Sequence, residues 1–220
     1  MELGNSLISI NGEQTPTLEI LFMLTVLMLL PSIVVMMTSF LRIIIILSFT
    51  RTAIGVQQTP PNIVLVGMAI FLSLFIMNPV IQQIDTDAYQ PYKAGEMTQE
   101  EALDKAVVPM KQFMLKQTEV SALNLFTDAA DSEQVDNPEE LSLVVIVPAF
   151  VTSELKRAFT AGLLLYIPFL LIDIIVSSTL MSMGMIMLPP SMISMPFKLL
   201  LFVTVNGWEL LFSSLVQSFK

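Results

Sequence analysis

The stretch Met181-Ser182-Met183-Gly184-Met185-Ile186-Met187-Leu188-Pro189-Pro190 separates two long apolar segments near the C-terminal end of the chain. The glycine permits a bend and the two prolines stop a helix, so the stretch predicts the turn of a helical hairpin. Methionine side chains are unbranched and polarizable, and they repack around neighbours of different shape. The turn therefore suits a deformable gate; the ordinary alternative is that its methionines fill gaps between helices. The candidate gate residues are Met181, Met183, Met185, Ile186 and Met187.

Two opposite charges in the flanking segments support the hairpin. If residues 160–188 and 196–219 form antiparallel helices joined at this turn, Asp173 and Lys198 lie equally far from its centre and meet across it. Opposite charges in a low-dielectric site relieve each other's desolvation, and breaking such a pair leaves an uncompensated charge. Arg157 or Arg42 could compensate Asp173 instead. Lys198 could also extend to a lipid headgroup, which a short carboxylate cannot reach.

The composition is that of a protein in or against a membrane. The 220 residues are 54% hydrophobic and 13% charged, with a mean hydropathy of +0.76, and this charge is low for a soluble domain. The chain has no cysteine and no histidine, which removes thiolate metal sites and the commonest acid–base side chain. We therefore expect no enzyme, no metal site and no cofactor. The first residues, polar to about Pro16, show no secretory signal, so we expect that a signal was removed or never used.

A hydropathy count predicts four membrane spans, because roughly 20 apolar residues are enough to cross a bilayer. The stretches are Leu18–Thr50, which Pro31 interrupts, Ile63–Ile81, Thr160–Leu188 and Pro196–Phe219. A lone charge at the bilayer centre costs at least about 2.5 kcal/mol, so charges in such stretches should face protein or water. The candidate buried charge network is Arg42, Glu154, Arg157, Asp173, Lys198 and Glu209. This pattern favours helices packed into an oligomer over independent anchors.

The segment between residues 82 and 140 carries the net charge of the chain. It holds 13 Asp and Glu against 4 Lys, so its net charge of −9 equals that of the whole protein. Arg42 and Arg51 border the connection between residues 51 and 62, and basic residues favour the cytoplasmic side of a membrane. We therefore expect the acidic segment on the opposite, periplasmic side. Lys156 and Arg157 do not fit a simple up-and-down topology.

Within the acidic segment, apolar residues at helical spacing predict an amphipathic helix over residues 99–115. Thr98 and Glu101 have the spacing of a capping box at its start. A second short helix is expected over residues 120–130, followed by an exposed loop to residue 140. Phe113 and Phe126 lie on apolar faces, and each is either local core or a subunit interface.

These observations predict an all-α fold of membrane-type helical hairpins with a small extracytoplasmic helical domain. Four parts are expected: a polar N-terminal segment at 1–17, apolar helices at 18–81, the acidic helical domain at 82–140, and an apolar hairpin at 141–220 with the methionine turn at 181–190.

Several strings in the chain resemble the FliP family of flagellar biosynthesis proteins and their counterparts in virulence type III secretion systems. The matching strings are MMTSFLRI at 36–43, AIGVQQTPPN at 53–62, DAYQP at 87–91, PAFVTSELKRAF at 148–159, residues 183–190, and PFKLLLFVTVNGW at 196–208. The resemblance implies an all-helical subunit that forms a ring of five copies with one FliR-like and several FliQ-like subunits. Such a ring would be the pore through which unfolded flagellar proteins leave the cytoplasm, and other flagellar export apparatus proteins would be further partners. No nucleic acid would be bound.

The resemblance also assigns a site and a place in the cell. The family's methionine seal falls on Met183, Met185 and Met187, and the location implied is the bacterial cytoplasmic membrane at the flagellar basal body. In assembled gates of the family, the helices form a tilted, cone-like stack raised toward the periplasm rather than four simple spans. Ile186 interrupts what is often a methionine triplet, and Asn206 replaces an acidic residue often found before Gly207-Trp208.

Two other functions are compatible with an apolar chain that contains intramembrane charges. An ion or small-solute channel or transporter should show inverted repeats or paired broken helices, and the sequence shows neither. A purely structural membrane scaffold would tolerate polar substitution of the methionine turn.

Overall fold

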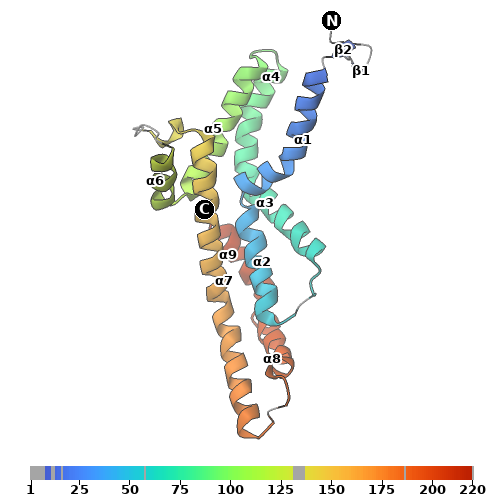
Figure 1. The fold of residues 1–220 in the computed structure, drawn as a ribbon, viewed down its shortest axis with the longest axis vertical. Helices are drawn as coiled ribbons and strands as arrows, with labels where there is room; N and C mark the ends of the chain where they lie inside the picture. Colours follow the sequence, from blue (N-terminus) through green and yellow to red (C-terminus); the bar gives the residue numbers. More distant parts are fainter. Residues whose placement is uncertain are drawn as a thin grey trace, which may run out of the picture.

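The computed structural model describes residues 8–10, 13–15, 17–56, 58–130, 137–185 and 187–219, and these form an elongated helical molecule (Figure 1). The helical fold class predicted from the sequence is confirmed. A short antiparallel hairpin of β1 (Ile8–Ile10) and β2 (Glu13–Thr15), with Ser9 opposite Gln14, precedes the first helix.

The axis of the molecule is α7 (Leu143–Ser182), a helix of 40 residues that passes through Pro148 and Pro168. At 1.5 Å per residue it is about 60 Å long. Its upper half packs along α2 (Phe40–Ile54), and this is the most extensive contact between two helices. The fully buried side chains of Ile43, Leu47, Ile146 and Phe150 belong to the core between and around these two helices. Each such side chain contributes about 1.5 to 3 kcal/mol through its removal from water.

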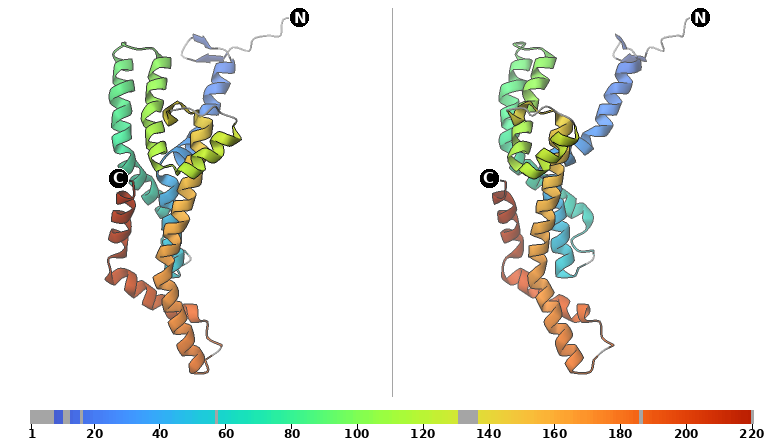
Figure 2. Two further views of the ribbon diagram at one scale, coloured as in Figure 1. Left: turned by 90° about the vertical axis from the view of Figure 1, so that its left-hand side faces the viewer. Right: turned by 60° about the vertical axis from the view of Figure 1, so that its left-hand side comes forward.

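A cluster of shorter elements covers the upper end of α7 (Figures 1 and 2). There α3 (Asn62–Ile84) continues through a π-helical turn (Asp85–Tyr89) into α4 (Gln90–Lys93), and α5 (Gln99–Gln117) returns beside it. The chain then forms α6 (Val120–Ala129) and a 3₁₀ turn (Pro138–Glu140) before α7. The two short helices expected in the acidic segment are thus present. The predicted loop at residues 131–136 lies outside the described residues.

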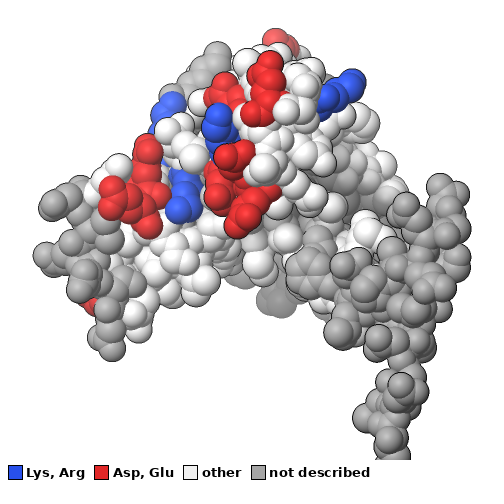
Figure 3. Space-filling model, turned by 90° about the horizontal axis from the view of Figure 1, so that it is seen from above, with Lys and Arg blue, Asp and Glu red and all other residues white. Residues whose placement is uncertain are grey.

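The predicted capping box at the start of α5 is confirmed. Thr98 Oγ1 accepts a hydrogen bond from the Glu101 amide at 3.3 Å, and Glu101 Oε2 accepts one from the Thr98 amide at 2.8 Å. These bonds from Thr98 to the carboxylate lower the pKa of Glu101 below its ordinary value. Seen from above, acidic side chains gather around a smaller number of basic ones on this upper face (Figure 3).

The lower half of the molecule is a helical hairpin. α7 descends to the turn, α8 (Pro190–Thr204) returns, and α9 (Gly207–Gln217) continues upward after a bend of 62° (Figure 2). Asn206 adopts a left-handed φ of 52° at the bend, and the Phe202 ring lies on Gly207 so closely that a Cβ there would be 2.3 Å from Cε2. The C-terminal end of the chain therefore lies beside Arg42 of α2 and Gln117 of α5 rather than at the tip of the hairpin.

Two expectations about the apolar stretches are wrong. α1 (Thr17–Met37) continues through Pro31, and the chain breaks at Thr38 and Ser39 instead. The four-span count also differs, because the first stretch is divided between α1 and α2 at Thr38 and Ser39, and the last stretch is bent at Asn206. Among the described residues, two helices (Asn62–Lys93 and Leu143–Ser182) are long and apolar enough to cross a membrane, or three spans if the bent pair α8–α9 counts as one. The predicted division at residue 82 remains a prediction, and a continuous helix crosses it.

Gly162 on α7 lets the Phe49 ring of α2 approach the helix backbone. A Cβ at this position would lie 2.6 Å from Phe49 Cγ, a distance that real Cβ atoms do not adopt. The ring also packs edge-on against Phe159, with centroids 5.5 Å apart. The close contact between α2 and α7 therefore depends on the missing side chain of this glycine.

We predict that Gly162→Ala destabilises the protein by about 1 to 3 kcal/mol, because the added methyl group overpacks a filled contact. The measurement is chemical unfolding of the purified chain in detergent. Gly67→Ala in α3 is the matched control: no atom lies within 4 Å of its added Cβ, and the change should stabilise the helix by about 0.5 to 1 kcal/mol. Equal stability of the two variants would contradict the predicted overpacking.

Candidate functional site: a methionine turn and two buried ion-pair clusters

The methionine turn begins with a regular helix end. The Gly184 amide donates to Met181 O at 3.0 Å, the Met185 amide donates to Leu180 O at 3.0 Å, and Gly184 has a φ of +76°. This is the Schellman arrangement, which closes the last carbonyl groups of a helix and favours glycine at the left-handed position. Pro190 is the first residue of α8 and so begins a helix rather than stopping one. The bend predicted at the glycine is present.

The methionines of the turn point away from the rest of this chain. Met181 is 66% exposed, Met183 71% and Met187 99%, while Met185 is 39% exposed. Ile186 lies outside the described residues. Met181, Met183 and Met187 therefore do not fill gaps between helices of their own subunit, whereas Met185 is partly covered by it.

An ion pair holds the two arms of the hairpin above the turn. Lys198 Nζ on α8 lies 2.6 Å from Asp173 Oδ2 on α7, and Ser194 Oγ donates to Asp173 Oδ1 at 2.6 Å. The Lys198 side chain is 5% exposed and that of Asp173 29%. This is the contact that their equal spacing from the turn predicts, and neither Arg42 nor Arg157 takes the place of Lys198.

A second and more deeply buried cluster lies higher on α7. Arg42 of α2 donates through Nε to Glu154 Oε2 at 2.8 Å and through Nη2 to Glu154 Oε1, a two-pronged pair between residues that are 3% and 0% exposed. Arg42 Nη1 donates to Ser218 Oγ at 3.1 Å and to Ser218 O at 3.3 Å. Its guanidinium carbon lies 3.8 Å from the centroid of the Phe219 ring. The cation thus holds the C-terminal end of the chain against α2 and α7.

Gln117, at the end of α5, connects this cluster to the upper helices. Its Oε1 accepts hydrogen bonds from Arg42 Nη2 at 3.1 Å and from Arg157 Nη1 at 2.9 Å, and its Nε2 donates to Phe219 O at 3.4 Å. Our reading of the sequence missed Gln117 and Ser218. Gln117 could have been found, because it is a polar residue four positions after Phe113 on the apolar face of its helix.

A surface ion pair lies beside the cluster. Glu119 Oε2 lies 2.6 Å from Lys156 Nζ, and this hydrogen bond lowers the pKa of Glu119. The Glu119 amide donates to Ser153 Oγ at 2.9 Å, which fixes the start of α6 on α7. Lys156 and Arg157, which did not fit a simple topology, therefore both serve contacts with the upper helices.

One candidate residue, Glu209, differs from expectation, and Phe113 takes the first of the two places expected for it, the local core. Glu209 is exposed in the first turn of α9 and is no part of a buried network; a helix N-terminus favours a carboxylate there. Phe113 is 9% exposed and packs in the core of its own subunit, 6.0 Å from the Phe150 ring and 6.3 Å from the Phe219 ring by centroid. It therefore offers little surface to another subunit. Phe126 is half-buried on α6.

The fold and these sites define a membrane-type helical protein with buried structural ion pairs and an exposed methionine turn. Residues 23–215 match the FliP family. The chain is 48% identical to the flagellar biosynthetic protein FliP of Pectobacterium carotovorum over 95% of its own length and 82% of that protein. It is 46% identical to the FliP of Bacillus subtilis over 98% of its length and all of that protein, and 46% identical to the FliP of Aquifex aeolicus over 95% and 88%. The chain belongs to the FliP family.

We predict that Asp173→Lys and Lys198→Glu each impair flagellar protein secretion, since each leaves two like charges facing one another in a largely buried site. The double reversal restores an ion pair and should recover part of the loss. Secretion and the amount of folded protein are measured together in cells carrying each variant. A double variant as defective as the worse single variant would show that the pairing is not what the protein requires.

We predict that Glu154→Gln destabilises the protein by about 3 to 5 kcal/mol, because it leaves Arg42 buried without a counter-charge. Unfolding of the purified chain in detergent measures the loss. Glu119→Gln, which breaks the exposed pair with Lys156, is the matched control and should have a much smaller effect. Replacing both members of the buried pair, as in Arg42→Met with Glu154→Leu, should be less harmful than Glu154→Gln alone. Equal effects of Glu154→Gln and Glu119→Gln would contradict the role of burial.

Proposed function

We propose that this chain is a pore-forming core subunit of the flagellar type III export gate, which conducts unfolded flagellar proteins across the cytoplasmic membrane. The observation that carries the proposal is the methionine turn at the tip of two helical arms, where three of the four described methionines are 66% to 99% exposed. The membership in a family of flagellar biosynthetic proteins supports the same conclusion.

The arms hold the turn in place while its side chains stay adaptable. Asp173 and Lys198 connect α7 to α8 above the turn, and the Schellman end of α7 fixes the start of the turn. Several such turns arranged around an axis would form a ring of thioethers. Apolar constrictions of this kind close a pore by excluding water, and flexible methionines can repack around a passing chain.

The apolar surface of the subunit supports assembly with other copies. The N-terminal part of α1 projects away from the other helices (Figures 1 and 2), and Leu27 and Met28 of α1 are 57% and 81% exposed. On α8, Met192, Phe197 and Leu200 are 69%, 55% and 67% exposed. Exposed apolar patches of this extent mark contacts with protein or lipid. We propose a ring of five copies completed by FliR-like and FliQ-like subunits, with the acidic helices on the periplasmic side.

We predict that changing Met183, Met185 and Met187 together to Ala widens the closed constriction. Membranes holding the complex should then leak ions or small solutes several-fold more, while export of flagellar proteins persists or falls modestly. Val at all three positions should seal better than Ala but slow export, because a β-branched side chain repacks poorly. The measurements are membrane conductance and flagellar protein secretion in the same cells.

The matched control is Met192→Ala, an exposed methionine on α8 outside the turn, which should not change conductance. A triple Ala variant as tight as the parent would overturn the assignment of the seal to these residues. Normal export and tightness after polar replacement of all three, for example by Gln, would favour a structural scaffold over a gate.

A further inference from the structure

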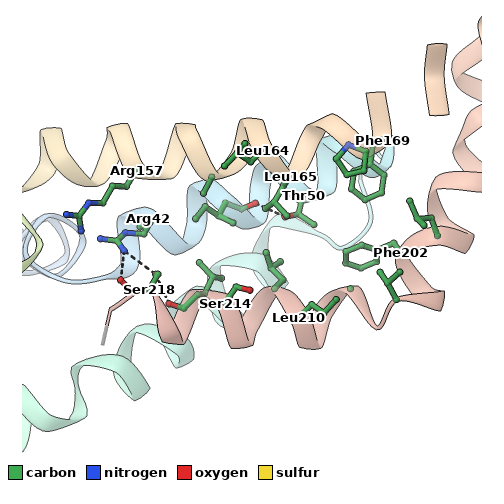
Figure 4. A pocket seen from close by; sticks show the side chains of 18 residues that line it. Arg42, Thr50, Arg157, Leu164, Leu165, Phe169, Phe202, Leu210, Ser214 and Ser218 are labelled. Carbon is green, nitrogen blue, oxygen red and sulfur yellow. Dashed lines mark hydrogen bonds between the residues drawn. The ribbon is translucent and has the colours of Figure 1, made fainter. Parts of the chain in front are cut away.

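A long groove lies between α7 on one side and α8 with α9 on the other, with α2 along its floor (Figure 4). Its volume is about 880 Å³. Most of its wall is apolar, and Ala161, Leu164, Leu165, Leu210 and Leu211 line its length. Leu164 and Leu210 are 61% and 57% exposed, so the groove is open along one side rather than sealed within the protein.

The two ends of the groove differ in chemistry. Arg42 and Arg157 lie at one end, and Phe169 and Phe202 at the other (Figure 4). Glu154 neutralises Arg42, whereas Arg157 donates to the neutral amide of Gln117. Glu119 and Glu154 both interact with the charge of Arg157, and each already has a closer cation. Among the described residues, the cationic end therefore keeps about one positive charge, on a half-buried side chain with spare N–H donors.

The groove has the length and placement of a lipid chain. Between Arg157 and Phe169 the helix advances 12 residues, about 18 Å, which is close to half of a hydrocarbon core of about 30 Å. Residues 158–172 of α7 carry no charge. The Lys156–Glu119 pair and the acidic helices lie on the other side of Arg157. Arg157 thus stands at the boundary between the polar and apolar parts of the molecule, where a headgroup would lie.

We propose that this groove binds an anionic phospholipid, with its phosphate at the Arg157 guanidinium and an acyl chain along Leu164 and Leu165 toward Phe169. Charge complementarity supports this occupant, because a guanidinium binds a phosphate through charge-assisted hydrogen bonds and the apolar wall of the groove suits an acyl chain. A helix from another chain would fill the apolar part but would need a carboxylate of its own at Arg157. The lipid site stands on the groove alone and does not depend on the export function.

The test uses the full chain in phosphatidylcholine nanodiscs that contain a phosphatidylglycerol with a photoreactive acyl chain. After irradiation, peptide mass spectrometry locates the lipid adducts. We expect adducts concentrated on residues 161–169 and 202–211, and Arg157→Gln should lower their yield about fivefold, the effect of one basic side chain near a membrane surface. Arg157→Lys, which keeps the charge, should retain most of the yield.

Matched variants separate this site from other effects. Lys116→Gln removes an exposed cation in the last turn of α5, outside the groove and outside the Lys156–Glu119 pair, and should leave the adducts unchanged. Ala161→Phe fills the groove without altering its charge and should also reduce them, which keeps the test informative if Arg157→Gln folds poorly. Adducts spread evenly over the apolar helices, or equal yields from parent and both groove variants, would overturn the proposal. A second result would also overturn it. If the adducts disappear when the chain is copurified with its partners, and groove residues instead cross-link to another chain, the groove holds a helix.

Discussion

The contact between Arg42 and Glu154 is the interaction on which the rest of the structure depends. The two buried charges are stable because they pair with each other and because the guanidinium has further partners. Arg42 also donates hydrogen bonds to Gln117 and Ser218, and it lies over the Phe219 ring. The partners come from α2, α5, α7 and the chain end, four parts of the sequence that no local signal connects. Loss of either Arg42 or Glu154 would leave the other charge buried without a counter-charge. The elements that supply the cluster must therefore pack together in the folded protein.

In the apolar helices, the distribution of polar and apolar side chains is partly inverted relative to a soluble domain. Four charged side chains lie largely inside, those of Arg42, Glu154, Asp173 and Lys198, whereas Lys156 and Glu209 are exposed. Leucine, methionine and phenylalanine side chains cover much of the outside of α1, α7 and α8. This arrangement suits a subunit whose surroundings are hydrocarbon or other subunits. The buried charges connect parts of one chain, and the exposed apolar side chains remain available for contacts outside it.

Helical periodicity and local spacing predicted the local features well. The helices of the acidic segment, the capping box of Thr98 and Glu101, and the bend at Gly184 all follow from residues close together in the chain. The equal spacing of Asp173 and Lys198 from the turn predicted their ion pair, which the structure contains. Pairing of Arg42 with Glu154 could not be read in this way, since 112 residues separate them. Pro31 was expected to interrupt its helix, but a proline can remain inside one. Glu209 was expected to be buried, but a carboxylate is favourable in the exposed first turn of a helix.

The short connection between α7 and α8 limits how a gate made from it can move. Hydrogen bonds to Leu180 and Met181 close one end, and Pro190 begins a helix at the other. Both described ends of the connection are therefore fixed by regular helix geometry. Small changes of aperture are then left to side-chain rotation, which takes picoseconds to nanoseconds for exposed residues. Larger changes of aperture would require α7 and α8 to tilt as whole helices. Such a motion would be slower and collective, and it would displace every subunit in contact with these helices.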